Sequence, residues 1–174
     1  MSDTGPIKEL DTIQGSSYLA IQAAIEVVRH HNPNLAQCHI RVVRDEKSEV
    51  VIFTGKNLRA GIGGSLAVRP ESREQLNAHD LSVLMSNTDH VKILDTVQGS
   101  SFLAIQAAVA VFQRYKPDLS QYKMAVVRDG NSLVVIFSDK GQQAGGLGSL
   151  GARPGFEVEL DSQDLRVLRS HFTR

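Results

Sequence analysis

The chain has 174 residues, of which 41% are hydrophobic and 22% are charged. This balance is typical of a globular protein and excludes collagen, a coiled coil or a largely disordered chain. Lysine plus arginine equals aspartate plus glutamate at 19 each, so the formal net charge is zero. Because no overall field attracts nucleic acid or an anionic membrane, we expect neither as a partner.

The first fourteen residues, MSDTGPIKELDTIQ, carry acidic residues and a proline where a secretory signal needs a basic start and an apolar run. The sequence also contains no apolar stretch long enough to span a bilayer. Cys38 is the only cysteine, which excludes an intramolecular disulfide and a multi-cysteine zinc site. We therefore expect a cytoplasmic protein.

An internal repeat dominates the chain. After a leader of residues 1–6, the segments 7–90 and 91–174 align without a gap at an offset of 84 residues, with 41 identities in 81 aligned positions. Shared stretches include QGSS, LAIQAA and VVIF. We expect each segment to be one small α+β unit. Since about 84 residues make a marginal core, we expect the two units to pack together as a pseudo-twofold pair.

Each repeat opens with a predicted helix. The stretches DTIQ at 11–14 and DTVQ at 95–98 have the spacing of a capping box, while Ser16 and Ser17 offer a later cap. The apolar residues that follow recur every three or four positions, which predicts an amphipathic helix packed on a core. The Asn-Pro pair at 32–33 ends the first helix.

A hairpin follows each helix. In the first repeat, the β-branched runs 40–44 and 50–53 flank a short polar turn, and in the second repeat Asp129-Gly-Asn131 occupies the turn. The glycine-rich stretches at 60–65 and 144–149 predict a long loop or an irregular edge strand.

Two further strands are predicted to close each repeat. In the second repeat they are the alternating run 156–160 and the run 165–171. The first repeat keeps the last strand at 81–86, but residues 71–75 have lost the alternation, so the third strand is expected to be frayed or shortened. The predicted fold class is therefore α+β, with one helix on a four-stranded antiparallel sheet in each repeat.

This order of elements, with the glycine pairs Gly63–Gly64 and Gly145–Gly146 and the closing segments 81–86 and 156–171, resembles the cystatin-like and NTF2-like small α+β proteins. It is most similar to bacterial NTF2-fold immunity proteins. The resemblance implies a cytoplasmic protein that binds and neutralises a toxin. The tandem arrangement also resembles the beta-lactamase inhibitory proteins, although this chain has neither their export signal nor their cysteine pairs.

The sequence gives little support for catalysis. The glycine loops have no following G-K-[ST] and lead to a strand, which argues against a phosphate site. His30 and His31 are adjacent on a helix and point apart, and no histidine has the spacing of a metal motif. Cys38 fits a small apolar filler, and the serines of QGSS fit helix caps. We expect no enzyme, no cofactor and no metal.

Arginines are the first candidates for a contact surface, because the planar guanidinium pairs with carboxylates while its stem packs. Arg69 and Arg153 lie beside the glycine loops, and Arg44 and Arg128 precede the hairpin turns. A structural ion pair is the alternative for Arg69 and Arg153. The repeats differ at Arg59 and at Gln142 and Gln143, which are further candidates for specificity. The glycine-loop candidates are Gly61, Gly63, Gly64, Gly145, Gly146 and Gly148.

We therefore predict a non-enzymatic cytoplasmic protein-binding module, monomeric or homodimeric, that acts as an inhibitor or immunity protein against a protein partner such as a cognate toxin. An NTF2-like small-molecule-binding protein or enzyme, with a pocket between helix and sheet, is the alternative. A deep pocket that contains a histidine or an aspartate favours this alternative. A structural or assembly subunit is a third hypothesis.

Overall fold

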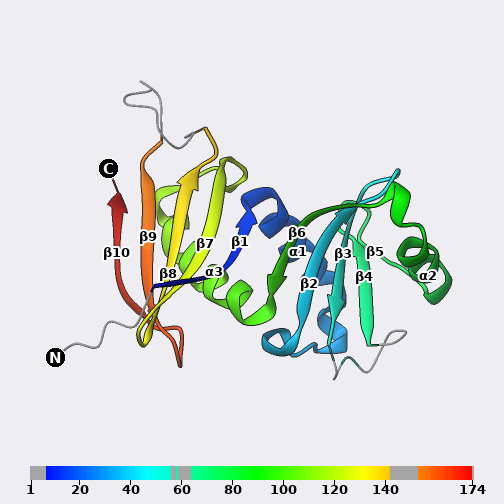
Figure 1. The fold of residues 1–174 in the computed structure, drawn as a ribbon, viewed down its shortest axis with the longest axis horizontal. Coiled ribbons are helices and arrows are strands. Elements are labelled where there is room, and N and C mark those ends of the chain that lie inside the picture. Colours follow the sequence, from blue (N-terminus) through cyan, green and yellow to red (C-terminus); the bar gives the residue numbers. More distant parts are fainter. Residues whose placement is uncertain (1–6, 56–57, 59–63, 142–152, 174) are drawn as a thin grey trace. The chain divides into compact units, whose positions relative to one another are not determined.

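The computed structural model describes residues 7–55, 58, 64–141 and 153–173. These residues form three α-helices and two antiparallel sheets of five strands each, so the protein belongs to the α+β class (Figure 1). The chain divides into two compact units. One consists of Met1–Gly15 and Ser101–Arg174, and the other of Ser16–Ser100.

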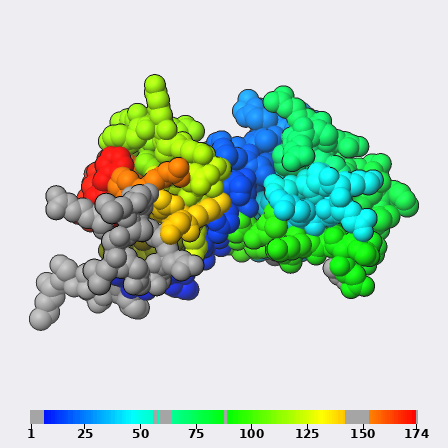
Figure 2. All heavy atoms as spheres, turned by 90° about the horizontal axis from the view of Figure 1, so that it is seen from above, coloured from blue at the N-terminus to red at the C-terminus, as the bar shows by residue number. Residues whose placement is uncertain are grey.

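The first unit is a sheet with one helix on its inner face. The strands lie in the order β1 (Lys8–Gln14), β7 (Tyr122–Asp129), β8 (Ser132–Asp139), β9 (Gly155–Asp161) and β10 (Val167–Thr173). The helix is α3 (Gly99–Phe112), and its Phe112 ring stacks on Phe156 of β9 with centroids 4.7 Å apart. Figure 2 shows the red C-terminal strand beside the yellow-green residues that follow α3, where Tyr115 and Phe172 meet edge to face.

The second unit is a sheet with helices on both faces. Its strands lie in the order β5 (Glu74–Gln75), β4 (Ser65–Arg69), β3 (Glu49–Thr54), β2 (His39–Arg44) and β6 (Lys92–Gln98). Helix α2 (Ala78–Ser86) packs on one face, while α1 (Gly15–Val28) lies behind the other (Figure 1). The middle residues of β3, numbers 50–53, are all buried because both faces are covered.

Short 3-10 helices join several of these elements. They are η1 (Arg29–His31), η2 (Leu35–Gln37), η3 (Thr88–His90), η4 (Gln113–Tyr115) and η5 (Leu119–Gln121).

The first strands of the two halves lie in unexpected places. Strand β1 pairs with β7, with Thr12 opposite Ala125, and β6 pairs with β2, with Thr96 opposite Arg41. Each sheet therefore has five strands, and the prediction of four was wrong. The capping boxes predicted at 11–14 and 95–98 were also wrong, because both stretches are strands. Each of these strands lies at one edge of its sheet and buries one side chain, Ile13 or Val97, so a weak alternation suffices.

The glycine of the QGSS motif is explained by close packing where strand turns into helix. A Cβ on Gly15 would lie 1.6 Å from the carbonyl oxygen of Leu119 in η5. A Cβ on Gly99 would lie 1.5 Å from the carbonyl oxygen of Leu35 in η2. Only glycine allows the backbone to approach so closely.

Several predictions are confirmed. The hairpins form as β2–β3 and β7–β8, and Gly130 takes a φ of 56° in the second turn. Helix α1 gives way to η1, and Asn32 then ends the helical segment in the left-handed region. The two closing strands of the second repeat are β9 and β10.

The last strand predicted for the first repeat, residues 81–86, is instead part of helix α2. The side chain of Asn77 caps this helix by accepting a hydrogen bond of 2.9 Å from the backbone N–H of Asp80. Leu81 and Leu84, three positions apart, pack on the sheet. The cap and the i, i+3 leucines are helix signals that outweigh the short apolar run.

The third strands start at different points of the aligned sequence. Phe53 of β3 pairs with Leu66 of β4, and Phe137 of β8 pairs with Phe156 of β9. Phe53 and Phe137 are 84 residues apart in sequence, whereas Leu66 and Phe156 are 90 apart. After the hairpins, residues at matching positions of the two sheets are therefore 90 residues apart, six more than the offset of the ungapped alignment.

Candidate functional site

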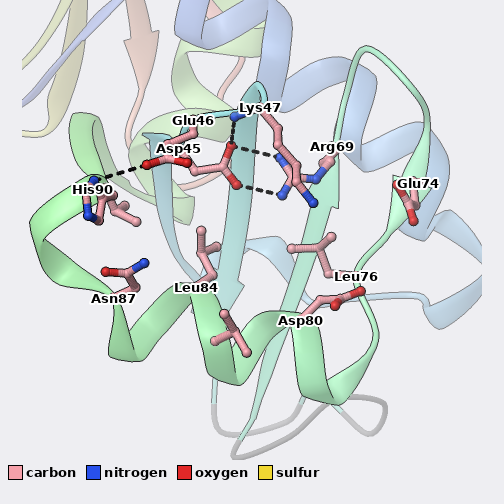
Figure 3. A pocket seen from close by; sticks show the side chains of 12 residues that line it. Asp45, Glu46, Lys47, Arg69, Glu74, Leu76, Asp80, Leu84, Asn87 and His90 are labelled. Carbon is pink, nitrogen blue, oxygen red and sulfur yellow. Dashed lines mark hydrogen bonds and ion pairs between the residues drawn. The ribbon is translucent and has the colours of Figure 1, made fainter.

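A pocket of about 380 Å³ lies in the second unit (Figure 3). It is bounded by the β2–β3 turn, the end of β4, the strand β5, helix α2 and the segment that leads to β6. The residues lining it are Asp45, Glu46, Lys47, Arg69, Glu74, Leu76, Asp80, Val83, Leu84, Asn87, His90 and Val91.

An ion pair between Arg69 and Asp45 forms one wall of the pocket. Two guanidinium nitrogens of Arg69 donate to the two carboxylate oxygens of Asp45, at 3.1 and 2.6 Å. Arg69 also donates to the hydroxyl of Ser48 at 2.9 Å. Both side chains are only 14% exposed. The hydrogen bond from Arg69 holds the pKa of Asp45 well below its usual value, so the carboxylate stays ionised.

The turn that holds Asp45 is itself ordered by this carboxylate. Its Oδ1 atom accepts backbone hydrogen bonds from Lys47 at 2.8 Å and Ser48 at 2.9 Å. An aspartate at the first position of a turn makes these bonds routinely. One carboxylate thus shapes the turn and neutralises the arginine.

A second and more exposed contact lies at one side of the pocket. His90 Nδ1 is 3.1 Å from Glu46 Oε1, with side chains 58% and 75% exposed. Figure 3 shows this pair on one side of the pocket and Glu74 on the opposite side. Because both side chains reach into water, the contact adds little to stability.

The remaining lining combines two carboxylates with aliphatic side chains. Glu74 on β5 and Asp80 on α2 are exposed. The hydrogen bond that Arg69 donates to Asp45 is the main cause that raises the pKa of Arg69, and the negative charges of Glu74 and Asp80 raise it further. Leu76 and Leu84 form the apolar wall and belong to the core cluster beneath α2. Among the described lining residues, four carboxylates (Asp45, Glu46, Glu74 and Asp80) face two fixed positive charges (Lys47 and Arg69), so negative charge is in surplus.

The chemistry of the lining side chains determines which group the pocket can hold. Among the described residues that line the pocket, none carries a hydroxyl or a thiol that could act as a nucleophile. Asp45 is a poor general base because its pKa is low and both of its oxygens accept hydrogen bonds. The pocket is suited to hold a cationic group with an aliphatic stem.

Arg69 and Arg153, which align in sequence, occupy different positions. Arg69 is the last residue of β4, beside the β2–β3 turn. Arg153 precedes β9, and its backbone N–H donates to Asp139 of β8 at 2.9 Å. The six-residue difference in register accounts for this separation. The structure thus gives Arg69 the ion pair considered as its alternative role, and it places Arg153 on an exposed segment.

Arg44 is the last residue of β2 and Arg128 the last but one of β7, and both are exposed. Arg44 pairs with Glu49 across the hairpin at 2.6 Å, whereas Arg128 lies opposite Lys8 of β1. Neither lines the pocket, so the structure does not bring the predicted arginines together. Arg59, Gln142, Gln143, Gly61, Gly63, Gly145, Gly146, Gly148 and the leader 1–6 lie outside the described residues. Gly64 is described and has a φ of 76°.

Cys38 is buried just before β2, and its thiol donates to the carbonyl oxygen of Asn34 at 3.3 Å. Burial raises the pKa of this thiol, which disfavours the nucleophilic thiolate. Within the described ranges, no three histidine, cysteine or acidic side chains are placed to hold a metal ion. No helix in the described part of the chain has the length and apolarity needed to cross a membrane.

Sequence analysis did not find Asp80, Glu74 or His90. The signal for Asp80 was the Asn77 cap, which predicts a helix and places the carboxylate in its first turn. Glu74 and His90 lie in the pocket because of the tertiary structure, and no sequence motif marks either residue. Comparisons with protein-family models, with curated proteins and with solved structures find no match to this chain.

Proposed function

We propose that this chain is a non-enzymatic cytoplasmic protein-binding module that holds a basic side chain of its partner in the pocket between the β2–β3 turn and α2. One observation carries the proposal. Glu74 and Asp80 lie at the edge of an aliphatic wall, Asp45 neutralises Arg69, and the described lining has more carboxylates than cations even with Lys47 counted. A lysine or arginine side chain fits this lining because its stem is apolar and its end is positive.

An inhibitor or immunity protein is the specific form of this function that the sequence resemblance supports. Such a protein covers its target, and a basic side chain of the target would serve as an anchor in the pocket. The resemblance to cystatin-like and NTF2-like proteins belongs to the same proposal.

We also infer that the chain arose by duplication of one unit with a first strand, a helix and four further strands. The internal identity supports this inference, as does the matching order of the strands in both sheets. In this view the two copies exchanged their first strands, since β1 pairs with β7 and β6 pairs with β2.

A small-molecule-binding function is the second candidate, because the pocket lies between a helix and a sheet and contains Asp80 and His90. A small cation has the same charge as a basic side chain. It differs in lacking the flanking peptide groups, which makes the two candidates separable by experiment.

The test is a titration followed by NMR of the leucine methyl groups. The ligands are N-acetyl-arginine methylamide, its uncharged citrulline counterpart and propylguanidine, a small cation that has the charge of the arginine side chain and no peptide groups. We expect the arginine compound to shift the signals of Leu76 and Leu84 and the citrulline compound to leave them in place. Binding of propylguanidine alone would support the small-molecule function, and equal effects of arginine and citrulline would contradict both.

A further inference from the structure

We propose that the outer face of the first sheet, formed by β1, β7, β8, β9 and β10, binds an amphipathic helix of a partner protein whose apolar side is flanked by basic residues. This surface lies in the other unit from the pocket. It therefore goes beyond the proposed function and does not depend on it.

The outer face carries a patch of aliphatic side chains on the neighbouring inner strands β7 and β8. The inner face is covered by α3, whose Phe112 contacts Phe137 and Phe156. The alternate side chains point away from α3, and the patch consists of Ala125 and Val127 on β7 and Val134 and Ile136 on β8. These four side chains are half-buried. A solvated sheet face normally carries polar residues at such positions.

The matching positions of the second sheet are covered by a helix. Val43 lies opposite Val50 in that sheet, as Val127 lies opposite Val134 in this one. Under α2, Val43 and Val50 are 2% and 0% exposed, and both pack in the cluster that contains Leu81 and Leu84. The same arrangement of valines therefore accepts a helix with leucines three positions apart.

The first unit has no described helix of its own for this face. After β4 and β5 the chain of the second unit forms α2, whereas after β9 the chain of the first unit forms β10. Strand β10 extends the sheet sideways, so the element that follows β9 does not place a helix on the outer face among the described residues. Helix α2 therefore indicates the kind of element that would cover the outer face of the first sheet.

The charges around the patch select the partner. Cross-strand pairing places five carboxylates and two fixed positive charges on the outer face. The carboxylates are those of Glu9, Asp129, Glu157, Glu159 and Asp161, and the positive charges are those of Lys123 and Arg169. Arg169 is already paired with Glu159 at 2.6 Å. A second copy of this chain would bring the same negative charges and be repelled. A partner helix with flanking lysine or arginine would be attracted.

The experiment uses two helical peptides of 18 residues that keep the spacing of Leu81 and Leu84. One carries lysine at its flanking positions and the other carries glutamate. We expect the lysine peptide to shift the methyl signals of Val127, Val134 and Ile136 and to bind at least tenfold more tightly than the glutamate peptide. Shifts confined to other residues, or equal binding of both peptides, would overturn the proposal.

A matched pair of variants separates docking from general charge attraction. Ile136→Glu lies in the patch, and Ile93→Glu is the same change at a residue of β6 that is 58% exposed. We expect Ile136→Glu to weaken the lysine peptide at least tenfold and Ile93→Glu to leave it unchanged. Equal effects would overturn the proposal. If Ile136→Glu lowers the melting temperature, Val134→Thr keeps the branched shape and is expected to weaken binding several-fold.

The two sites are tested independently. The double variant Glu74→Gln/Asp80→Asn removes charge from the pocket and is expected to leave binding of the lysine peptide to the sheet face unchanged. Loss of that binding in the pocket variant would show that the peptide occupies the pocket and would overturn the sheet-face proposal.

Discussion

Arg69 and Asp45, 24 residues apart in sequence, are joined by two charge-assisted hydrogen bonds at the edge of the pocket. The pair links the end of β4 to the β2–β3 turn. It has two consequences. It stabilises the turn, and it neutralises the positive charge of Arg69, so that this charge does not repel a cationic ligand in the pocket.

Asp45→Asn is expected to lower the free energy of unfolding by about 2–3 kcal/mol at pH 7, because it leaves Arg69 largely buried without its counter-charge. The pKa of Asp45 is lowered in the folded state, so its contribution is present above the unfolded pKa of about 4 and is lost as the pH falls further. Denaturant unfolding of the wild type and of Asp45→Asn at several pH values measures this pH-dependent contribution to the free energy of unfolding. The difference between wild type and variant should shrink below pH 4, and a constant difference would contradict the assignment.

Arg44→Ala is the control for this pair. Arg44 also bonds a carboxylate across the hairpin, but its side chain is 59% exposed. We expect a loss of less than about 1 kcal/mol, as for other surface ion pairs.

Gly15→Ala and Gly99→Ala are each expected to destabilise the protein by about 3 kcal/mol or more, because the new methyl group would overlap a backbone carbonyl oxygen. Thermal unfolding measures the effect. Gly130→Ala is the control, since a Cβ there meets nothing within 4 Å and only the positive φ is costly. Its expected loss is about 1 kcal/mol. Equal losses at all three glycines would argue against the close packing.

Exchange of the first strands can be tested by cross-linking in a Cys38→Ala background. Thr12→Cys with Ala125→Cys should form a disulfide, because these residues are cross-strand neighbours in β1 and β7. Thr96→Cys with Arg41→Cys should do the same in β6 and β2. An unexchanged first repeat would instead pair Thr12 with Arg41. Efficient cross-linking of Thr12→Cys with Arg41→Cys in the monomer would contradict the exchange.

Helix α2 should depend on its buried leucines and its cap. Leu84→Ala is expected to cost about 2–4 kcal/mol, since Leu84 packs in the core cluster at 8% exposure. Asn77→Ala should cost about 1 kcal/mol through loss of the cap. Ser82→Ala, on the exposed side of α2, should change stability by less than about 0.5 kcal/mol. If Leu84→Ala behaved like Ser82→Ala, α2 would not be packed on the sheet.

Local patterns predicted the central elements of the fold, because those elements follow short-range rules. The stripe in α1, the hairpin turn at Gly130 and the alternation in β9 each depend on residues close in sequence. The first strands were missed because their pairing partners lie 113 positions away for Thr12 and 55 for Thr96, in a different repeat for each. The periodicity of a sequence gives no information on which distant strand β1 or β6 pairs with.

The candidate site was predictable only in part. Arg69 could be selected by residue type, but its ion pair with Asp45 depends on the register of β4, which departs from the ungapped alignment. Asp80 and Leu84 reach the pocket because residues 78–86 form a helix, and the short apolar run had suggested a strand. The cap at Asn77 was the local signal that distinguishes the two.

The most direct test of the central claim is the affinity of N-acetyl-arginine methylamide for wild type and for Glu74→Gln/Asp80→Asn, measured by titration calorimetry or NMR. Glu71→Gln, an exposed carboxylate outside the pocket, is the matched control. We predict that the double variant binds about tenfold more weakly, about 1.4 kcal/mol, and that the control binds like wild type. Equal affinity of the wild type and the double variant would contradict a pocket that selects a basic side chain.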